Sequence, residues 1–263
     1  MPNRRHFITL AAAAAAFVAT PAFALGSLVD VDIVDRSQNE LLPVHHQRGT
    51  AWVAGRPGSR YAVRLANRSG VRVMVVLSVD GINAVTGETA GLGQVGYVLM
   101  PGQSTEITGW RKSLTEAAAF YFTALPDSYA ARTDRPDNVG VIGVAVFRER
   151  ERVPDVSRRP FDRAEPGVAQ NADQARGAAE SSAAPAAKAA GGLREERLGT
   201  GHGEREYMPT SHTRFERASD RPSEIVRLRY DSRERLLASG VILPRRAPWV
   251  PEAFPGFVPD PNG

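Results

Sequence analysis

The stretch Val139-Gly140-Val141-Ile142-Gly143-Val144-Ala145-Val146-Phe147 is the most strand-like part of this sequence. Its residues are mostly β-branched or small, and its second half does not alternate between apolar and polar positions. A strand with one face in water keeps that alternation, whereas a strand covered on both faces is apolar throughout. Residues 71–77 show the same loss of alternation. We therefore predict that both stretches are central strands of a sheet.

Shorter strand-like runs lie on the N-terminal side of this stretch. At residues 29–34 valine and isoleucine alternate with aspartate, which is the period-two pattern of a half-buried strand. Further runs separated by turn residues occur at 41–46, 51–53, 60–66, 96–99, 104–107 and 118–123. Many short strands at regular spacing favour a sandwich or a barrel. We predict an all-β fold, an antiparallel β-sandwich of the Ig-like or jelly-roll-like kind, over residues 25–148.

Turn residues separate these runs. Asp80-Gly81 tolerates the positive φ angles of a two-residue hairpin loop, and Pro101-Gly102 favours a turn between two strands. We therefore interpret Asp80 as a turn residue and not as a catalytic acid.

The composition changes after residue 148. Residues 149–192 are first dense in charge and then rich in alanine, glycine and proline, so we expect a disordered linker. In 193–243 we predict a small β-hairpin of residues 213–217 and 224–230, which docks on the sandwich. A short helix should follow, capped near Ser232 and ending at Gly240. The glycine-rich run 199–204 is expected to be a flexible lead into the hairpin, and 244–263 a Pro-rich tail.

The first 24 residues match a secretory signal peptide. Arg4 and Arg5 give a positive start, an alanine-rich apolar stretch follows, and Ala22-Phe23-Ala24 is a small-x-small cleavage site. The arginine pair with Phe7 two residues later resembles the twin-arginine signal, although Asn3 and Thr9 depart from its strongest form. An ordinary Sec signal is the alternative. We expect export to the periplasm or secretion, with no membrane span after cleavage.

Composition excludes several classes of function. The chain has no cysteine, so disulfides, thiolate chemistry and a lipoprotein anchor are excluded. Residues 1–24 hold two arginines and no acid, so the remainder carries 31 basic and 29 acidic residues. This near balance, without a clustered basic stretch, argues against nucleic-acid binding.

Two small groups of residues are candidates for binding. Trp110 with Arg111 at a strand end, and Tyr121 on the outer side of its strand, can contact a sugar ring or a partner protein. His45, His46 and His202 are the candidate metal ligands. Adjacent histidines on a strand point to opposite faces, which argues against one shared ion. We therefore expect no cofactor, with a metal ion as the alternative.

Three segments resemble a group of uncharacterised exported β-sandwich proteins of Gram-negative bacteria. They are residues 79–87 (VDGINAVTG), 96–99 (GYVL) and 140–147 (GVIGVAVF). The resemblance implies export and a sandwich fold, and it brings no assigned activity and no catalytic residues.

Our leading hypothesis is a non-catalytic binding protein of the cell envelope whose partner is a protein or a glycan. The alternatives are a periplasmic enzyme or metal carrier that is exported folded, and a structural subunit of the envelope. The sequence lacks a G-x-S-x-G nucleophile motif, so we favour a protein that is not an enzyme.

Overall fold

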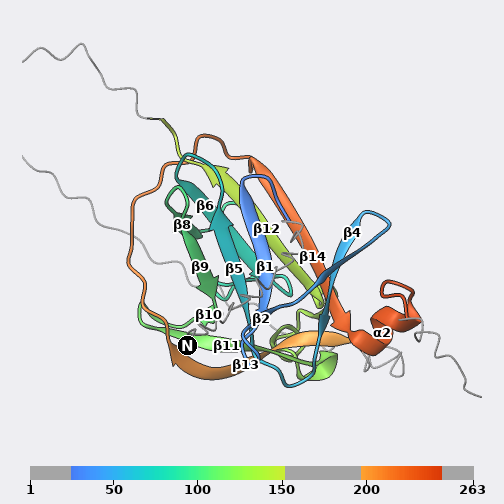
Figure 1. The fold of residues 1–263 in the computed structure, drawn as a ribbon. Helices are drawn as coiled ribbons and strands as arrows, with labels where there is room; N and C mark the ends of the chain where they lie inside the picture. The colour runs from blue at the N-terminus through green and yellow to red at the C-terminus, as the bar shows by residue number, and fades with distance from the viewer. Residues whose placement is uncertain (1–24, 152–196, 245–263) are drawn as a thin grey trace, which may run out of the picture.

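The computed structural model describes residues 25–151 and 197–244, which form three packed sheets (Figure 1). A four-stranded sheet has the order β2 (Glu40–Leu41), β1 (Val29–Asp35), β5 (Tyr61–Asn67), β9 (Ser104–Ile107). A three-stranded sheet has the order β10 (Gly109–Arg111), β11 (Glu116–Ala124), β13 (Leu198–Tyr207). A seven-stranded sheet has the order β3 (Val44–Gln47), β4 (Thr50–Gly55), β14 (Glu224–Ser232), β12 (Val141–Arg148), β6 (Val73–Val79), β7 (Ile82–Asn83), and β8 (Tyr97–Leu99) also pairs with β6.

The core lies where these sheets face one another. The four-stranded sheet contributes residues such as Ile33 and Leu65, and the seven-stranded sheet contributes Leu77 and Val144. The three-stranded sheet, at the lower end of the view in Figure 1, adds aromatic side chains to the same cluster. The prediction of an all-β, sandwich-like fold is confirmed.

The expected strands up to residue 148 are present, except that the run 41–46 is divided between β2 and β3, which belong to different sheets. β6 and β12 each have a hydrogen-bonded strand on both sides, as predicted for central strands. Asp80 and Gly81 form the two-residue loop between β6 and β7 with φ angles of 54° and 77°, the conformation of a hairpin turn with two positive φ angles. Pro101-Gly102 lies between β8 and β9, where the chain crosses from one sheet to the other. These local predictions succeeded because turn chemistry depends on neighbours in sequence.

The C-terminal segment differs from the prediction. β14 is not one arm of a hairpin with residues 213–217, because it pairs antiparallel with β12 and parallel with β4 inside the large sheet. Of residues 213–217, Arg217 forms an isolated bridge with Glu149. Residues 197–244 therefore complete the sandwich and do not dock on it as a separate hairpin. The apolar face of Val226, Leu228 and Tyr230 is buried against the same core.

The short helix after β14 matches the prediction. α2 (Arg233–Ala238) is capped by Ser232, whose side chain accepts a hydrogen bond from the backbone N–H of Arg235. Gly240 follows with a φ angle of 71°. Leu236 and the residues after the helix pack against Trp52 and Ala54 of β4.

The glycine-rich run 199–204 is part of strand β13 and not a flexible lead. Gly199, Gly201 and Gly203 share one face, and that face is covered by other side chains. A Cβ atom at Gly201 would lie 2.1 Å from Cζ of Tyr121 on the paired strand. A Cβ at Gly199 would lie 2.5 Å from Cβ of Ser128, at the start of α1 (Tyr129–Arg132). Glycine has a low strand propensity, so sequence alone could not identify a strand whose glycines make room for neighbours.

A buried polar junction ties the three sheets together. One carboxylate oxygen of Asp80 accepts hydrogen bonds from the Tyr230 hydroxyl at 2.5 Å and the Gly140 N–H at 2.9 Å. The other accepts from the Thr200 N–H at 2.7 Å. The Thr200 hydroxyl lies 2.6 Å from that of Tyr61 and 2.7 Å from that of Tyr230. Asp80 and Thr200 are fully buried, so this junction holds the fold together and offers no surface to a ligand.

Burial raises the pKa of Asp80 to about 6, and the hydrogen bonds from Tyr230, Thr200 and Gly140 oppose part of that rise. The turn prediction for Asp80 was therefore correct, but it did not include this second role.

Several predictions fall on residues outside the described ranges. These are the signal peptide at 1–24, most of the linker at 149–192 and nearly all of the tail at 244–263. Within the described part of the chain, no helix is long and apolar enough to cross a membrane.

Candidate functional site

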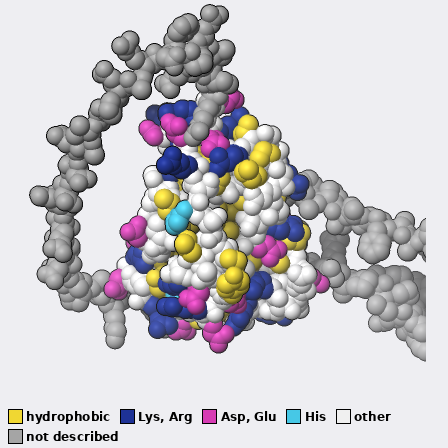
Figure 2. Space-filling view, turned by 90° about the vertical axis from the view of Figure 1, so that its left-hand side faces the viewer, with side chains coloured by type: hydrophobic (Ala, Val, Ile, Leu, Met, Phe, Trp, Pro, Cys, Tyr) yellow, Lys and Arg dark blue, Asp and Glu magenta, His cyan; other side chains and the backbone are white. Residues whose placement is uncertain are grey.

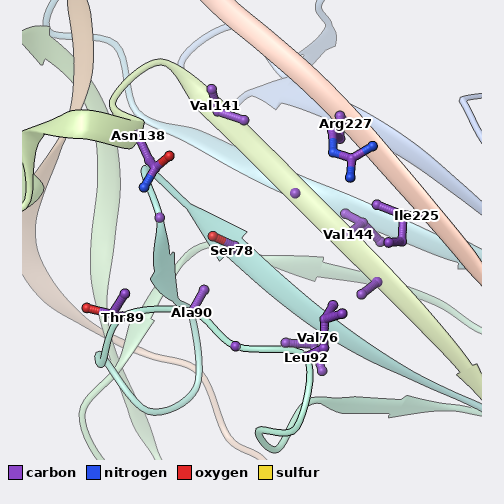
Figure 3. Close-up of a pocket in the computed structure, with 14 residues that line it drawn as sticks. Val76, Ser78, Thr89, Ala90, Leu92, Asn138, Val141, Val144, Ile225 and Arg227 are labelled. Carbon is purple, nitrogen blue, oxygen red and sulfur yellow. The ribbon is translucent and has the colours of Figure 1, made fainter. Parts of the chain in front are cut away.

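A groove lies on the outer face of the seven-stranded sheet, on the side away from the core (Figure 3). It has a volume of about 390 Å³, and its floor is formed by β6, β12 and β14. Figure 3 shows Ile225 and Arg227 projecting from β14 on one side, and Ala90 and Leu92 on the other. The latter two belong to the 84–96 loop, which joins β7 to β8. Two rims of different origin therefore enclose one apolar floor.

The groove follows from small residues in the middle strand. The strand register places Gly143 of β12 between Ser78 and Arg227, and the adjacent row places Ala145 between Val76 and Ile225. A Cβ at Gly143 would meet one atom within 4 Å, Cβ of Ser78 at 3.7 Å, which is ordinary contact. Packing therefore does not require glycine at this position. Its missing side chain leaves the floor of the groove open.

The 84–96 loop is held in place by Asn83, a buried residue at its start. The Asn83 side-chain oxygen accepts a hydrogen bond from the Val85 N–H at 2.7 Å, and its NH₂ group donates to the Gln94 side-chain oxygen at 3.0 Å. The same Gln94 oxygen accepts from the Gly91 N–H at 2.8 Å. These hydrogen bonds fix the shape of the loop rim.

Arg217 fixes the loop from the opposite direction. It donates hydrogen bonds to the carbonyl oxygens of Leu92 at 2.8 Å and Gln94 at 2.5 Å. Its guanidinium carbon lies 4.1 Å from the ring centroid of Phe147, which is close enough for a cation–π contact. Phe147 belongs to a second hydrophobic cluster on the outer face, against which Phe215 packs. The segment before β14 therefore covers one part of this face and leaves the groove uncovered by any described residue.

The charge of the groove is positive. Of its lining residues, Arg227 alone is charged, and it makes no ion pair with any described residue. Arg229 follows Arg227 by two residues and lies on the same face of β14. Its guanidinium carbon is 5.6 Å from the ring centroid of Trp52. A second hollow of about 690 Å³ contains Trp52 and Arg229 and shares Asn138 and Val141 with the groove. The uncovered part of the sheet thus combines apolar side chains with arginines.

A different face of the molecule has no dominant charge. Figure 2 shows acidic and basic side chains interspersed there, with hydrophobic side chains between them. This distribution agrees with the nearly equal numbers of acids and bases in the sequence. It contrasts with the groove, where Arg227 lies next to no acid of residues 25–151 or 197–244 in the lining.

The structure does not bring the candidates Trp110, Arg111 and Tyr121 together on one surface. Trp110 is fully buried and packs edge-on against Phe120 at 4.8 Å. Arg111 is half-buried and donates to the carbonyl oxygen of Met208. Tyr121 is half-buried and lies against the glycines of β13. A role for these residues in ligand binding remains a prediction.

The three candidate metal ligands are also separated. His45 and His46 lie on β3, at the edge of the large sheet, whereas His202 lies on β13. Within residues 25–151 and 197–244, no group of three or more His, Cys, Asp or Glu residues could hold a metal ion. The pKa of both His45 and His202 is lowered, mainly by burial.

The groove was not predicted. Gly143, a glycine within a central apolar strand, is the sequence feature that could have indicated the groove, but sequence could not show whether another side chain fills its place.

Comparison of the chain with protein-family models, curated proteins and solved structures finds no match.

Proposed function

We propose that this chain is an exported binding protein of the cell envelope, and not an enzyme, whose groove binds an extended acidic segment of a partner protein. The observation that carries the proposal is the open floor at Gly143 beside the unpaired Arg227. Export to the periplasm or outside the cell rests on the signal-like residues 1–24.

The lining favours a peptide over a glycan. Val76, Leu92 and Ile225 supply apolar contact, and among the residues that the structure describes no aromatic ring that could stack on a sugar lines the groove. An apolar groove with a few fixed polar groups suits the side chains of a protein segment. Arg227 can form a two-point hydrogen-bonded pair with a carboxylate, which selects for aspartate or glutamate. Arginine does not exchange protons at neutral pH, so the groove provides contact surface and not acid–base chemistry.

Selection from a random peptide library on the purified protein tests this proposal. We expect enrichment of peptides that combine an acidic residue with apolar residues. Gly143→Leu fills the floor and Arg227→Glu reverses the charge, so each should reduce binding at least tenfold. Arg148→Glu is the matched control for the charge reversal. Arg148 is exposed on β12, the strand that carries Gly143, and it does not line the groove.

Three outcomes would overturn the proposal: enrichment without acids, binding that survives Gly143→Leu, or binding to a glycan array with no peptide selected. Export is tested separately by replacing Arg4 and Arg5 with lysine. Undiminished export of that variant would contradict the twin-arginine route and leave the Sec route.

A further inference from the structure

A third hollow, the His202 pocket, lies where β13 meets α1. It has a volume of about 400 Å³ and is lined by Asp127, Tyr129, Arg132, Thr133 and His202. It shares no lining residue with the groove. Any binding here is therefore independent of the function proposed above.

Aromatic rings give this pocket a fixed wall. The ring centroids of Tyr129 and His202 lie 4.9 Å apart, and the His202 ring is nearly parallel to that of Trp110 at 6.2 Å. Tyr129 also contacts Trp110, with centroids 4.8 Å apart. Trp110 is fully buried, and its indole N–H has no hydrogen-bond partner among the described atoms. Packing on Trp110 therefore holds both rings in place.

Positive charge surrounds the wall. Arg132 is exposed and makes no ion pair within the described residues. The Lys112 ammonium lies 5.3 Å from the ring centroid of Tyr129. Arg205 also acts electrostatically on His202, but its guanidinium forms an ion pair with Glu116 at 3.2 Å. Asp127 is the one acid among the lining residues and Arg132 the one permanent cation, and Lys112, at the Tyr129 ring, adds a second cation beside the pocket.

These cations also act on His202. Burial lowers the pKa of His202 most, and Lys112, Arg205 and Arg132 lower it further. A bound anion would offset the three cations and raise this pKa, so His202 reports on the charge of whatever occupies the pocket.

We propose that the His202 pocket binds a small ligand that carries a phosphate or carboxylate group on a ring-shaped body. Arg132 and Lys112 hold the charged group, because guanidinium and ammonium groups form strong charge-assisted hydrogen bonds with oxyanions. Tyr129 and His202 hold the ring by face contact. A hollow of this size accommodates a small organic molecule and not only a bare ion.

NMR titration of the histidine ring signals in the purified protein tests this proposal. Glucose 6-phosphate should shift the His202 signals in a saturable way and raise the pKa of His202. Inorganic phosphate should bind more weakly, and glucose should cause no shift. Arg132→Gln should weaken binding about tenfold, since it removes one charge-assisted contact. Lys112→Gln should weaken it in the same direction.

Matched controls are available in the same spectrum. His45 lies on β3, and its pKa is lowered by burial and by Arg233, so His45 should not respond to the ligand. Arg233→Gln and Gly143→Leu should leave binding at His202 unchanged.

Equal shifts at His45 and His202, or unchanged affinity in Arg132→Gln, would overturn the proposal. Equal affinity for phosphate and glucose 6-phosphate would overturn the ring contact. Loss of binding in Gly143→Leu would show that the site is not independent of the groove.

Discussion

Gly199 of β13 and Gly143 of β12 are both strand glycines, and they occupy opposite environments. At Gly199 an added Cβ would lie 2.5 Å from Cβ of Ser128 and 2.8 Å from Cγ1 of Val139, both buried. At Gly143 it would meet only Cβ of Ser78, at 3.7 Å. The first glycine lets two parts of the core close together, and the second leaves a hollow at the surface. The same residue type therefore marks a closed junction in one region and an open groove in another.

The largest effect should come from the closed junction, next to Gly199, where Asp80 accepts hydrogen bonds from three buried donors. Asp80→Ala leaves the N–H groups of Gly140 and Thr200 and the Tyr230 hydroxyl without that partner. We expect the free energy of unfolding to fall by about 4 kcal/mol, measured by urea denaturation.

Asp80→Asn keeps the turn conformation and loses one acceptor, so it should cost less than Asp80→Ala. No loss in Asp80→Asn beside a large loss in Asp80→Ala would mean that backbone strain at this positive φ angle, and not the hydrogen bonds, explains the effect.

The second effect is a pH dependence at the same junction. The pKa of Asp80 is about 6 in the folded protein and 3.8 as its ordinary value, so the folded state binds this proton more tightly than the unfolded state. The stabilisation that comes from this proton, as distinct from the hydrogen bonds that Asp80 accepts, is therefore complete below pH 3.8 and is lost as the pH rises through 6.

The difference in unfolding free energy between the native protein and Asp80→Asn should shrink by roughly 3 kcal/mol over that range. Urea titrations at several pH values measure it. A difference that grows with pH would reverse the sign and contradict the raised pKa.

The third effect tests the closed glycine itself. Gly199→Ala forces Ser128 or Val139 to move, and we expect a loss of about 2 kcal/mol in the free energy of unfolding. Thermal unfolding of the variant measures the change. A neutral result would show that α1 moves freely away from β13, which would also weaken the case for a fixed His202 pocket.

The smallest effect should have the opposite sign. Gly143→Ala places a methyl group in open space within a strand, so it should stabilise the protein by about 0.5 kcal/mol. The urea midpoint measures this shift. A loss of more than about 1 kcal/mol would mean that the floor of the groove is packed and that the contrast with Gly199 does not hold.

How much the sequence could predict depends on the range of the interaction. The turn at Asp80-Gly81 and the cap at Ser232 were correct because each involves neighbours in the chain. The predicted pairing of β14 with residues 213–217 was wrong, because alternation of apolar and polar residues shows which face of a strand is buried and not which strand lies beside it. β13 was missed because its glycines are explained by Tyr121 and Ser128, which are distant in sequence.

Composition and local periodicity were enough to predict an all-β chain with two central apolar strands, near-neutral charge and no cysteine chemistry. The way the sheets close depends instead on contacts between residues that are distant in sequence. Asp80 and Thr200 are 120 residues apart, yet their hydrogen bond joins β13 to the turn after β6. The groove and the His202 pocket were decided in the same way, since a hollow is a relation among side chains that packing brings together.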